Sequence, residues 1–596
     1  MVFTIDREEA EEGVNIVRQA RINFRRRAIG HSVVGIAVAV IVALLLVVPV
    51  AIFLVQGFMP GLFDHQYPLL TFGGFRYMVS GQTLQGIVDS LGVSISAGLI
   101  ATVLGLITAW ILRRTDIGAK RLWAGAIWFL LLVPTYLSTE GWQRLLEPSG
   151  VLAKAHINAA PVYHIFFGPF GVVFVLAMSG IPFAFLAIAT SLGNLGAELE
   201  DAAKVHSGSS FETFKIIVPV VMPSLISAFA IVFAESMSDF GVAYTLAANA
   251  HFPIATYSLF SAIDSIPLNF QDAAAIGWLL VGSAMVPILL QRRLMKSKSY
   301  AVVGGRRRLV KVSAVRGKSR LLMYGFMIAT FFLAVLVPLF GIVSASLIGG
   351  LGTNFGAATL TLSNYRRVLS ETIGGSPLRY SGMLSIATAT VTVLFAAYLA
   401  RILARRDQSI ASRMLDFLLL GSVALPGIVL GAGYIFSYNQ PFLSDIGLNL
   451  YGTSKLLFLG YVASALPISS RMLVGPLSQV QSNMSFAARV HGARAMNAWF
   501  QTVFPILSKV MLSAWLLTFS KTLLELPLSQ LLYPPGSIPL SVAINKLTAG
   551  YDYGGGTAMS VIALLAALIV IGLANGAYRI FAPKGWQKMG GMFNDD

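Results

Sequence analysis

Residues 199–208 read LEDAAKVHSG, and a close copy, FAARVHG, occupies residues 486–492 in the second half of the chain. The residues that recur are Ala202, Ala203, Val205 and His206 in the first stretch and Ala487, Ala488, Val490 and His491 in the second. Each copy is amphipathic and lies between two long apolar runs. A polar helix that is present twice between membrane spans is expected to bind a partner outside the membrane.

The composition is that of a membrane protein. The 596 residues are 56% hydrophobic and only 12% charged, with a mean hydropathy of +0.75. Soluble domains carry about 25% charged residues. Apolar runs of 20 or more residues recur, and a helix of that length crosses a hydrocarbon core of about 30 Å. We therefore predict an all-α polytopic membrane protein.

The apolar runs predict about twelve transmembrane helices with both termini in the cytoplasm. This arrangement places most Lys and Arg residues in inner segments and few in outer loops, as the positive-inside rule expects. The net charge of +17 is therefore assigned to membrane topology, and no nucleic-acid partner is expected. The predicted spans are 32–57, 88–112, 122–139, 164–191, 220–246, 272–291, 321–347, 381–404, 414–437, 455–478, 507–533 and 557–582.

The two halves are predicted to be parallel six-helix repeats. Residues 70–76 read LTFGGFR and residues 360–366 read LTLSNYR, each just before the second span of its half. Prolines also match: Pro134 with Pro426 in the third spans and Pro182 with Pro467 in the fourth. The expected divisions are a cytoplasmic amphipathic N-terminal segment 1–30, a first repeat 31–291, a linker 292–320, a second repeat 321–582 and a cytoplasmic tail 583–596.

The linker between the repeats, residues 292–320, contains eleven basic residues and no acidic one. Anionic lipid headgroups attract such a segment. Membrane lipids are therefore expected partners of the linker. Gly317-Lys-Ser319 resembles the end of a phosphate-binding loop, but Val312 stands where that motif needs a glycine. No nucleotide site is predicted there.

The second polar stretch resembles the EAA loop of ABC-importer permease subunits, whose pattern is Glu-Ala-Ala, three residues, Gly and a later Pro. It keeps that spacing with Ala487, Ala488, Gly492 and Pro505, and Phe486 stands in the acidic position. The first stretch keeps the acid as part of Asp-Ala-Ala 201–203, with Gly208 one position late.

The resemblance implies a type I ABC importer permease fold, in which each repeat carries a cytoplasmic coupling helix. The two EAA-like loops are 199–223 and 484–508, and each coupling helix is expected to dock on one of two ATP-binding cassette subunits. An interfacial helix that only caps the bundle is the alternative. The coupling residues implied by the resemblance are Asp201, Ala202, Ala203, His206, Gly208, Ala487, Ala488, His491 and Gly492.

Other segments resemble fused permeases of the ferric-iron type. They are SDFG at 238–241, LELP at 524–527 and LLYPPG at 531–536. Related importers of 2-aminoethylphosphonate, thiamine and phosphorylated sugars share much of this pattern. The resemblance implies a subunit in the bacterial inner membrane that receives ferric iron or a small phosphonate- or phosphate-type solute from a periplasmic binding protein. No cofactor is expected in this chain, which is not expected to be an enzyme; ATP and Mg²⁺ belong to the partner subunits.

Four ionisable residues are expected to lie within the membrane. Glu235 and Lys521 each follow the loop proline, Pro219 or Pro505, by sixteen residues, and Asp239 and Glu525 lie four residues further on. This spacing predicts one depth and one helical face in both repeats. Such residues are costly in lipid and usually face a pathway or a partner. We predict that they line or gate the pathway; the alternative is a structural ion pair such as Lys521 with Glu525.

Two other classes of function remain to be weighed. An ion-gradient-driven secondary transporter also uses two six-helix repeats, and it would use the same four residues as ion sites, but it leaves the repeated polar helix unexplained. A membrane enzyme would need a catalytic constellation at one depth, and none is recognised. The chain has no cysteine, and its histidines lack metal-ligand spacing. We therefore favour the ABC importer permease and predict no metal site.

Overall fold

The computed structural model describes most of the chain as a bundle of helices. The described residues are 34–63, 68–195, 210–296, 314–349, 360–370, 372–404, 409–423, 425–445, 447, 449–480 and 483–583. Within them the only β-type pairing is an isolated bridge between Ile348 and Leu360. This agrees with the predicted all-α fold class.

The helices of the first repeat surround α4 and α9, which pack along each other and against α11. The elements are α2 (Val48–Gln56), η1 (Pro60–Leu62), α3 (Gly73–Met78), α4 (Gly81–Arg114), α5 (Lys120–Leu132), α6 (Thr135–Leu146), α7 (Val151–Lys154), α8 (Ala160–Phe166), α9 (Pro169–Asn194), α11 (Ser210–Ser238), the π-helical turn η2 (Ala243–Ala247), α12 (Ala255–Asp264) and α13 (Phe270–Lys296).

The second repeat is built in the same order around α17, α21 and α24. Its elements are α14 (Gly317–Phe331), the π-helical turn η3 (Phe332–Leu336), α15 (Val337–Ser346), α16 (Ser363–Ser370), α17 (Thr372–Leu403), α18 (Ile410–Ser422), α19 (Gly427–Tyr438), α20 (Pro441–Asp445), α21 (Ser454–Gln479), α22 (Asn483–Val490), α23 (Ala495–Thr502), α24 (Phe504–Leu523), α25 (Pro527–Leu532), α26 (Leu540–Ala549) and α27 (Tyr553–Phe581).

Nine helices of the described chain are long and apolar enough to cross a membrane, and three bent helix pairs raise the number to twelve if each pair is one span. Every predicted span overlaps one of these helices or pairs. Large apolar side chains face outward along them, as on α27, where Leu573 is 68% and Ile580 78% exposed. A lipid environment accounts for such surfaces, because large apolar patches left in water favour aggregation.

Two predicted spans are sharply bent rather than straight. The span expected at 122–139 turns by 97° between α5 and α6, and the one expected at 414–437 turns by 110° between α18 and α19. Pro134 and Pro426 stand at the bends, each in an extended conformation before the next helix. Proline lacks the N–H that would continue the helix and forces the preceding residue out of the helical region, so both spans break there.

Two further spans stop earlier than predicted. The spans expected at 220–246 and 507–533 end at Ser238 in α11 and at Leu523 in α24. A short helical segment then follows each span: η2 after α11 and α25 after α24. The prediction of continuous spans was wrong, because polar and helix-starting residues, Asp239 and Pro527, interrupt the apolar runs.

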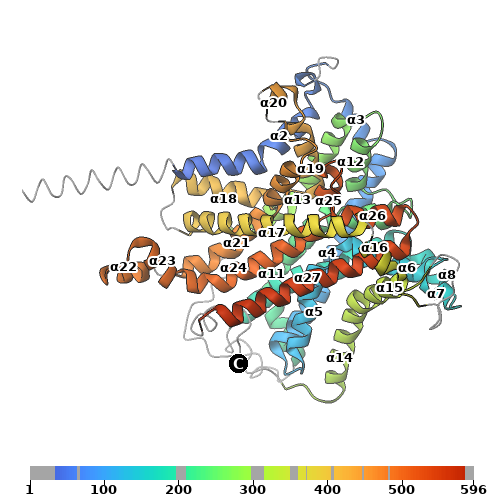
Figure 1. Cartoon of the computed structure of the whole chain (residues 1–596). Helices are drawn as coiled ribbons and strands as arrows, with labels where there is room; N and C mark the ends of the chain where they lie inside the picture. Colours follow the sequence, from blue (N-terminus) through green and yellow to red (C-terminus); the bar gives the residue numbers. More distant parts are fainter. Residues whose placement is uncertain are drawn as a thin grey trace, which may run out of the picture.

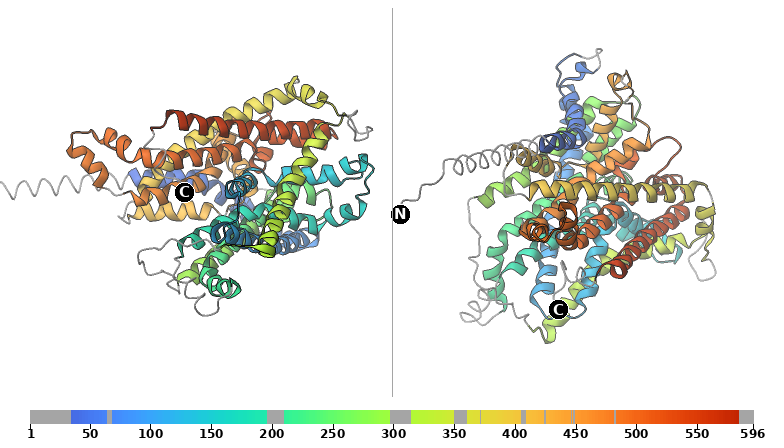
Figure 2. Two further views of the ribbon diagram at one scale, coloured as in Figure 1. Left: turned by 90° about the horizontal axis from the view of Figure 1, so that it is seen from below. Right: turned by 60° about the vertical axis from the view of Figure 1, so that its left-hand side comes forward.

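The first span of each repeat packs on the other repeat. Helix α2 lies against α19, and α15 lies against α6. In Figure 1 the blue N-terminal helices accordingly lie beside α18 and α19, while α15 lies beside α6; Figure 2 gives two further views of the bundle. Hydrogen bonds seal the first contact: Tyr434 Oη donates to Leu45 O (2.8 Å) and Ser437 Oγ to Pro49 O (3.0 Å).

Both exchanged contacts depend on glycine. A Cβ on Gly141 of α6 would lie 2.2 Å from Pro338 O of α15, and a Cβ on Gly433 of α19 would lie 2.9 Å from Pro49 O of α2. Gly141 follows Pro134 by seven residues, as Gly433 follows Pro426. The two contacts are therefore equivalent in the two repeats, which supports the predicted internal duplication.

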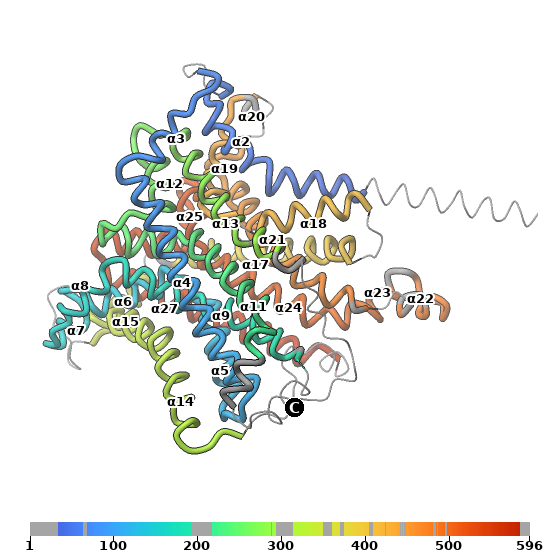
Figure 3. The backbone as a smooth tube through the Cα atoms, turned by 180° about the vertical axis from the view of Figure 1, so that it is seen from behind, coloured from blue at the N-terminus to red at the C-terminus, as the bar shows by residue number. Residues whose placement is uncertain are grey.

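Two sides of the bundle matter for function. Helices α22 and α23 project from one side, at the left of Figure 1, whereas α6, α7, α8 and α16 gather at the opposite side. Figure 3 shows the same separation from behind. We call these the α22 side and the α16 side.

Candidate translocation pathway and coupling helix

The four predicted intramembrane residues meet in one cavity of about 300 Å³ at the junction of the two repeats. Glu235 and Asp239 reach it from the end of α11, and Lys521 and Glu525 from the end of α24. The bend between α18 and α19 and the middle of α21 form other parts of its wall. The structure thus brings together residues that are almost 300 positions apart in sequence.

Asp239 caps the segment that follows α11. Its Oδ1 accepts a hydrogen bond from Val242 N (2.7 Å), and its Oδ2 accepts one from Thr135 Oγ1 (2.7 Å) at the start of α6. Its carbonyl accepts a third from Thr256 Oγ1 of α12 (2.8 Å). Asp239 therefore connects three elements of the first repeat.

Glu525 has the same role in the second repeat. Its two carboxylate oxygens accept hydrogen bonds from Leu528 N and Ser529 N, both at 2.9 Å, at the first turn of α25. The Ser541 hydroxyl of α26 donates to its carbonyl, as Thr256 does to Asp239. Carboxylates that accept from free N–H groups at a helix start stabilise that start.

Glu235 and Lys521 have fewer contacts than the two capping carboxylates. Glu235 lies on the exposed face of α11, and within the described chain no hydrogen bond or ion pair engages it. The Lys521 ammonium lies 5.6 Å from the centre of the Phe183 ring. Within the described residues Lys521 and Glu525 form no ion pair, so the predicted structural alternative was wrong in that form. The structural role of Glu525 is to cap α25.

The predicted shared helical face is also corrected. Asp239 and Glu525 lie just beyond the ends of α11 and α24, so neither repeat has its two residues at i and i+4 of one continuous helix. All four residues still line one cavity, because α11 and α24 both end beside it.

A second cavity of about 240 Å³ adjoins the first. Both cavities are lined by Ser464, Ile468, Lys521, Glu525 and Pro527. We call the two together the central chamber. Tyr461 stands in its wall, with its hydroxyl hydrogen-bonded to Ser529 Oγ at 2.6 Å.

A larger cavity of about 800 Å³ lies on the α16 side, and we call it the vestibule. Its carboxylates are Glu140, Glu147 and Asp264, and its one cationic side chain among the described residues is Arg144. Glu140 is only 3% exposed and joins the repeats, because it accepts hydrogen bonds from Thr548 Oγ1 and Ser560 Oγ, both at 3.1 Å. The sequence interpretation missed Glu140; its only signal was an acidic residue directly after an apolar run.

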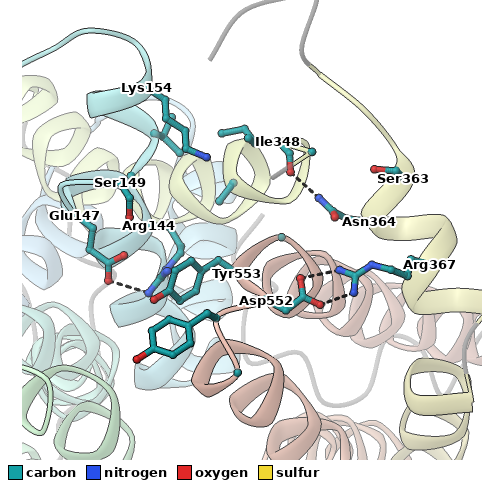
Figure 4. A pocket seen from close by; sticks show the side chains of 17 residues that line it. Arg144, Glu147, Ser149, Lys154, Ile348, Ser363, Asn364, Arg367, Asp552 and Tyr553 are labelled. Carbon is teal, nitrogen blue, oxygen red and sulfur yellow. Dashed lines mark hydrogen bonds and ion pairs between the residues drawn. The ribbon is translucent and has the colours of Figure 1, made fainter. Parts of the chain in front are cut away.

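A pocket of about 540 Å³ adjoins the vestibule on the same side (Figure 4). Arg144 pairs with Glu147 at 2.8 Å and lies 3.7 Å above the centre of the Tyr553 ring, which belongs to the other repeat. Arg367 of α16 forms a two-pronged ion pair with Asp552 at 2.6 and 2.7 Å. Burial works to raise the pKa of Asp552, but hydrogen bonds from Arg367 and Gly555 outweigh it and lower that pKa below its ordinary value.

The second EAA-like loop forms a helix, a turn and another helix. Helix α22 contains Ala487 and Ala488 and ends before His491 and Gly492. Gly492 has φ +89°, its N–H donates to Arg489 O, and Ala493 N donates to Ala488 O. These two bonds and the left-handed glycine make a Schellman helix end. The expected role of Gly492 in the turn agrees with this geometry.

The surface of α22 is open to a partner. Val490 is 84% and Met484 41% exposed, and His491 is exposed beside them. The first EAA-like loop cannot be compared, because Asp201, Ala202, Ala203, His206 and Gly208 lie outside the described residues. Within the described residues no group of three or more His, Asp and Glu side chains is arranged as a metal site.

No protein-family model matches the chain. Over 510 residues it is 24% identical to the ferric transport system permease protein FbpB of Actinobacillus pleuropneumoniae, a match that covers 83% of this chain and 71% of that protein. It is 23% identical over 465 residues to the probable ABC transporter permease protein y4fN of Sinorhizobium fredii, covering 76% and 80%.

A shorter relative matches part of the chain. The sulfate transport system permease protein CysT of Escherichia coli is 24% identical over 213 residues, or 35% of this chain and 75% of the relative. These relatives are transport permeases rather than enzymes. The expected resemblance is confirmed: over most of its length the chain is similar to fused, two-lobed permeases of ABC importers of the ferric type.

Proposed function

We propose that this chain is the permease subunit of an ATP-driven importer in a bacterial inner membrane, with ferric iron as its transported solute. A small phosphonate- or phosphate-type solute is the second candidate. The observation that carries the proposal is the central chamber, in which matching residues from the two repeats, Asp239 with Glu525 and Glu235 with Lys521, face one space. An importer needs such a space at the interface of two halves that move relative to each other.

The α22 side faces the cytoplasm in this proposal, and both termini lie there. Two ATP-binding cassette subunits dock on the two EAA-like loops and supply ATP and Mg²⁺, while a periplasmic solute-binding protein docks on the α16 side. Closure of the ATP-binding pair draws the loops together and opens the pathway toward the α16 side. Hydrolysis returns the pathway to the α22 side. The exposed apolar surface of α22, with Val490 at its tip, supports a docking role.

The acidic lining favours the cation among the two solute classes. Three of the four residues at the ends of α11 and α24 are acidic, and an anion in the central chamber would be repelled unless Lys521 shielded it. The names of the ferric relatives point the same way, whereas the sulfate relative covers a smaller share of the chain.

Reconstitution in liposomes tests this function. The chain is purified with its ATP-binding subunit and loaded binding protein, and uptake of labelled ferric ion, phosphate and sulfate is compared with and without internal ATP. We expect uptake of ferric ion that requires ATP and ignores an ionophore. Uptake by the chain alone that an ion gradient drives and an ionophore abolishes would instead establish a secondary transporter.

A further inference from the structure

One residue lies between the vestibule and the central chamber. Tyr136, in the first turn of α6, lines both spaces, and it is the only described residue that does so. Its side chain is 1% exposed, so the ring fills the boundary rather than projecting into open space. Displacement of this one ring would therefore connect the vestibule with the central chamber.

The Tyr136 hydroxyl is buried without a hydrogen-bond partner in the described chain. A buried hydroxyl without a hydrogen-bond partner is costly, so such groups usually meet a ligand, a water molecule or another conformation of the protein. Asn545, in the wall of the vestibule and 7% exposed, has an equally unpartnered Nδ2. Polar groups therefore remain available on the vestibule side of the partition.

The surroundings of the hydroxyl suit a cation. Glu140 lines the vestibule and Glu525 the central chamber, and Tyr136 shares a cavity wall with each of them. The vestibule itself has three carboxylates and one arginine among its described lining residues. Phenol and carboxylate oxygens are ligands for hard cations. A cation passing from one space to the other would meet oxygen atoms before, at and after the partition.

The position of Tyr136 is tied to the end of α11. Its neighbour Thr135 donates to Asp239, and a Cβ on Gly241 would lie only 3.0 Å from Tyr136 N. Movement of the α11 end would therefore shift the start of α6, and Tyr136 with it. Since the first EAA-like loop, residues 199–223, runs into α11 (Ser210–Ser238), this contact offers a route from the coupling region to the partition.

We propose that Tyr136 is the gate of the pathway on the α16 side: its ring closes the floor of an acidic vestibule that receives a cation, and its displacement joins the vestibule to the central chamber. The proposal rests on the proposed function for its direction of transport. It goes beyond that function by naming the gate and the class of solute that the vestibule admits.

Thiol accessibility tests the gate directly, because the chain contains no cysteine. Ser464→Cys places a thiol in the central chamber, and Asn249→Cys places one in the vestibule. Each is treated in intact cells without the ATP-binding subunit, using membrane-impermeant cationic and anionic methanethiosulfonates. Rates are divided by those of each reagent with a free thiol in solution.

We expect the vestibule thiol to react and the chamber thiol to be protected while Tyr136 is present. Tyr136→Ala should raise the reaction rate of the chamber thiol at least about tenfold, as when a rare open state becomes the common one. Tyr136→Phe should keep the chamber thiol protected, because the ring remains. Tyr163→Ala, which alters a tyrosine that lines the vestibule but not the chamber, is the matched control and should also leave it protected.

In the Tyr136→Ala background the cationic reagent should react faster than the anionic one. Protection of the chamber thiol that persists in Tyr136→Ala, or equal exposure in the Tyr163→Ala control, would overturn the gate; a faster anionic reagent would overturn the cation preference. Tyr136→Val serves the same comparison if the alanine variant does not reach the membrane. Labelling needs neither solute nor ATP, so its failure is distinguishable from failure of the importer function.

Discussion

Asp239 and Glu525 combine two tasks within single side chains. Each carboxylate caps the segment after a broken span through backbone N–H groups, Val242 in one repeat and Leu528 with Ser529 in the other. Each also lines the central chamber. Glu235 lines the same space without a cap, so the chamber contains carboxylates that differ in what they stabilise.

This difference predicts separable effects in two variants. Glu525→Gln replaces one acceptor oxygen with an NH₂ group that cannot accept from Leu528 or Ser529, so we expect a loss of stability of about 1 kcal/mol, typical of a lost helix cap. Glu235→Gln should leave stability unchanged and lower the transport rate. Thermal unfolding of the purified protein, followed by tryptophan fluorescence, measures the first effect, and uptake in liposomes measures the second. Equal melting temperatures for both variants would contradict the capping role.

At the scale of elements, the exchange of first spans is what holds the repeats together. Helix α15 approaches α6 so closely that each backbone touches the other at Gly141 and Gly341. The equivalent crossing of α2 over α19 at Gly433 is less tight and gains two side-chain hydrogen bonds instead. The two crossings are equivalent in position, but they differ in how much room they leave for a side chain at the glycine.

Alanine substitutions at the two crossings should therefore differ. Gly141→Ala puts a methyl group 2.2 Å from a backbone oxygen, and we expect it to destabilise the protein at the upper end of the roughly 1–3 kcal/mol range for overpacking. Gly433→Ala, at 2.9 Å, should cost less. Gly125→Ala on α5 is the control, because a Cβ added there would meet no atom of another element within 4 Å. The yield of monodisperse protein and its melting temperature give the order; an order in which Gly125→Ala equals Gly141→Ala would refute the argument.

For the whole molecule, the spaces form a series: the vestibule on the α16 side, the partition at Tyr136, and the central chamber between the repeats. Helix α22 projects on the opposite side (Figure 1). In the proposed importer, movement of α22 would pass through α23 and α24 to the chamber. The stiffness of the α22 turn then becomes a property of the entire transporter.

Gly492 sets that stiffness, because a residue with a side chain is strained by about 1–2 kcal/mol at its φ of +89°. We expect Gly492→Val to reshape the end of α22 and to uncouple ATP hydrolysis from transport in the assembled importer, while the chain still inserts. ATPase activity and uptake are measured on the same liposomes. Gly475→Ala in α21, also with open space around it, is the control and should remain coupled. Normal coupling in Gly492→Val would argue against docking through α22.

The sequence by itself determined the all-α class, the twelve-span pattern, the duplication and the set of intramembrane charges, because each depends on local apolar length or on repetition along the chain. Pro134 and Pro426 were visible as a matching pair, yet the size of the bends they cause was not. The four residues Glu235, Asp239, Lys521 and Glu525 were found by spacing alone. Their place in one cavity follows from the structure.

Only the tertiary structure decided which groups meet. The helix caps made by Asp239 and Glu525, the exchange of α2 and α15 between repeats, and the partition at Tyr136 all join residues that are distant in sequence or separated by a break between helices. Glu140 is inconspicuous in the sequence and central in the fold, because Thr548 and Ser560 reach it from the other repeat. Apolar periodicity reports on contact with lipid, whereas a pathway is made by polar contacts between helices, and those depend on how the whole chain packs.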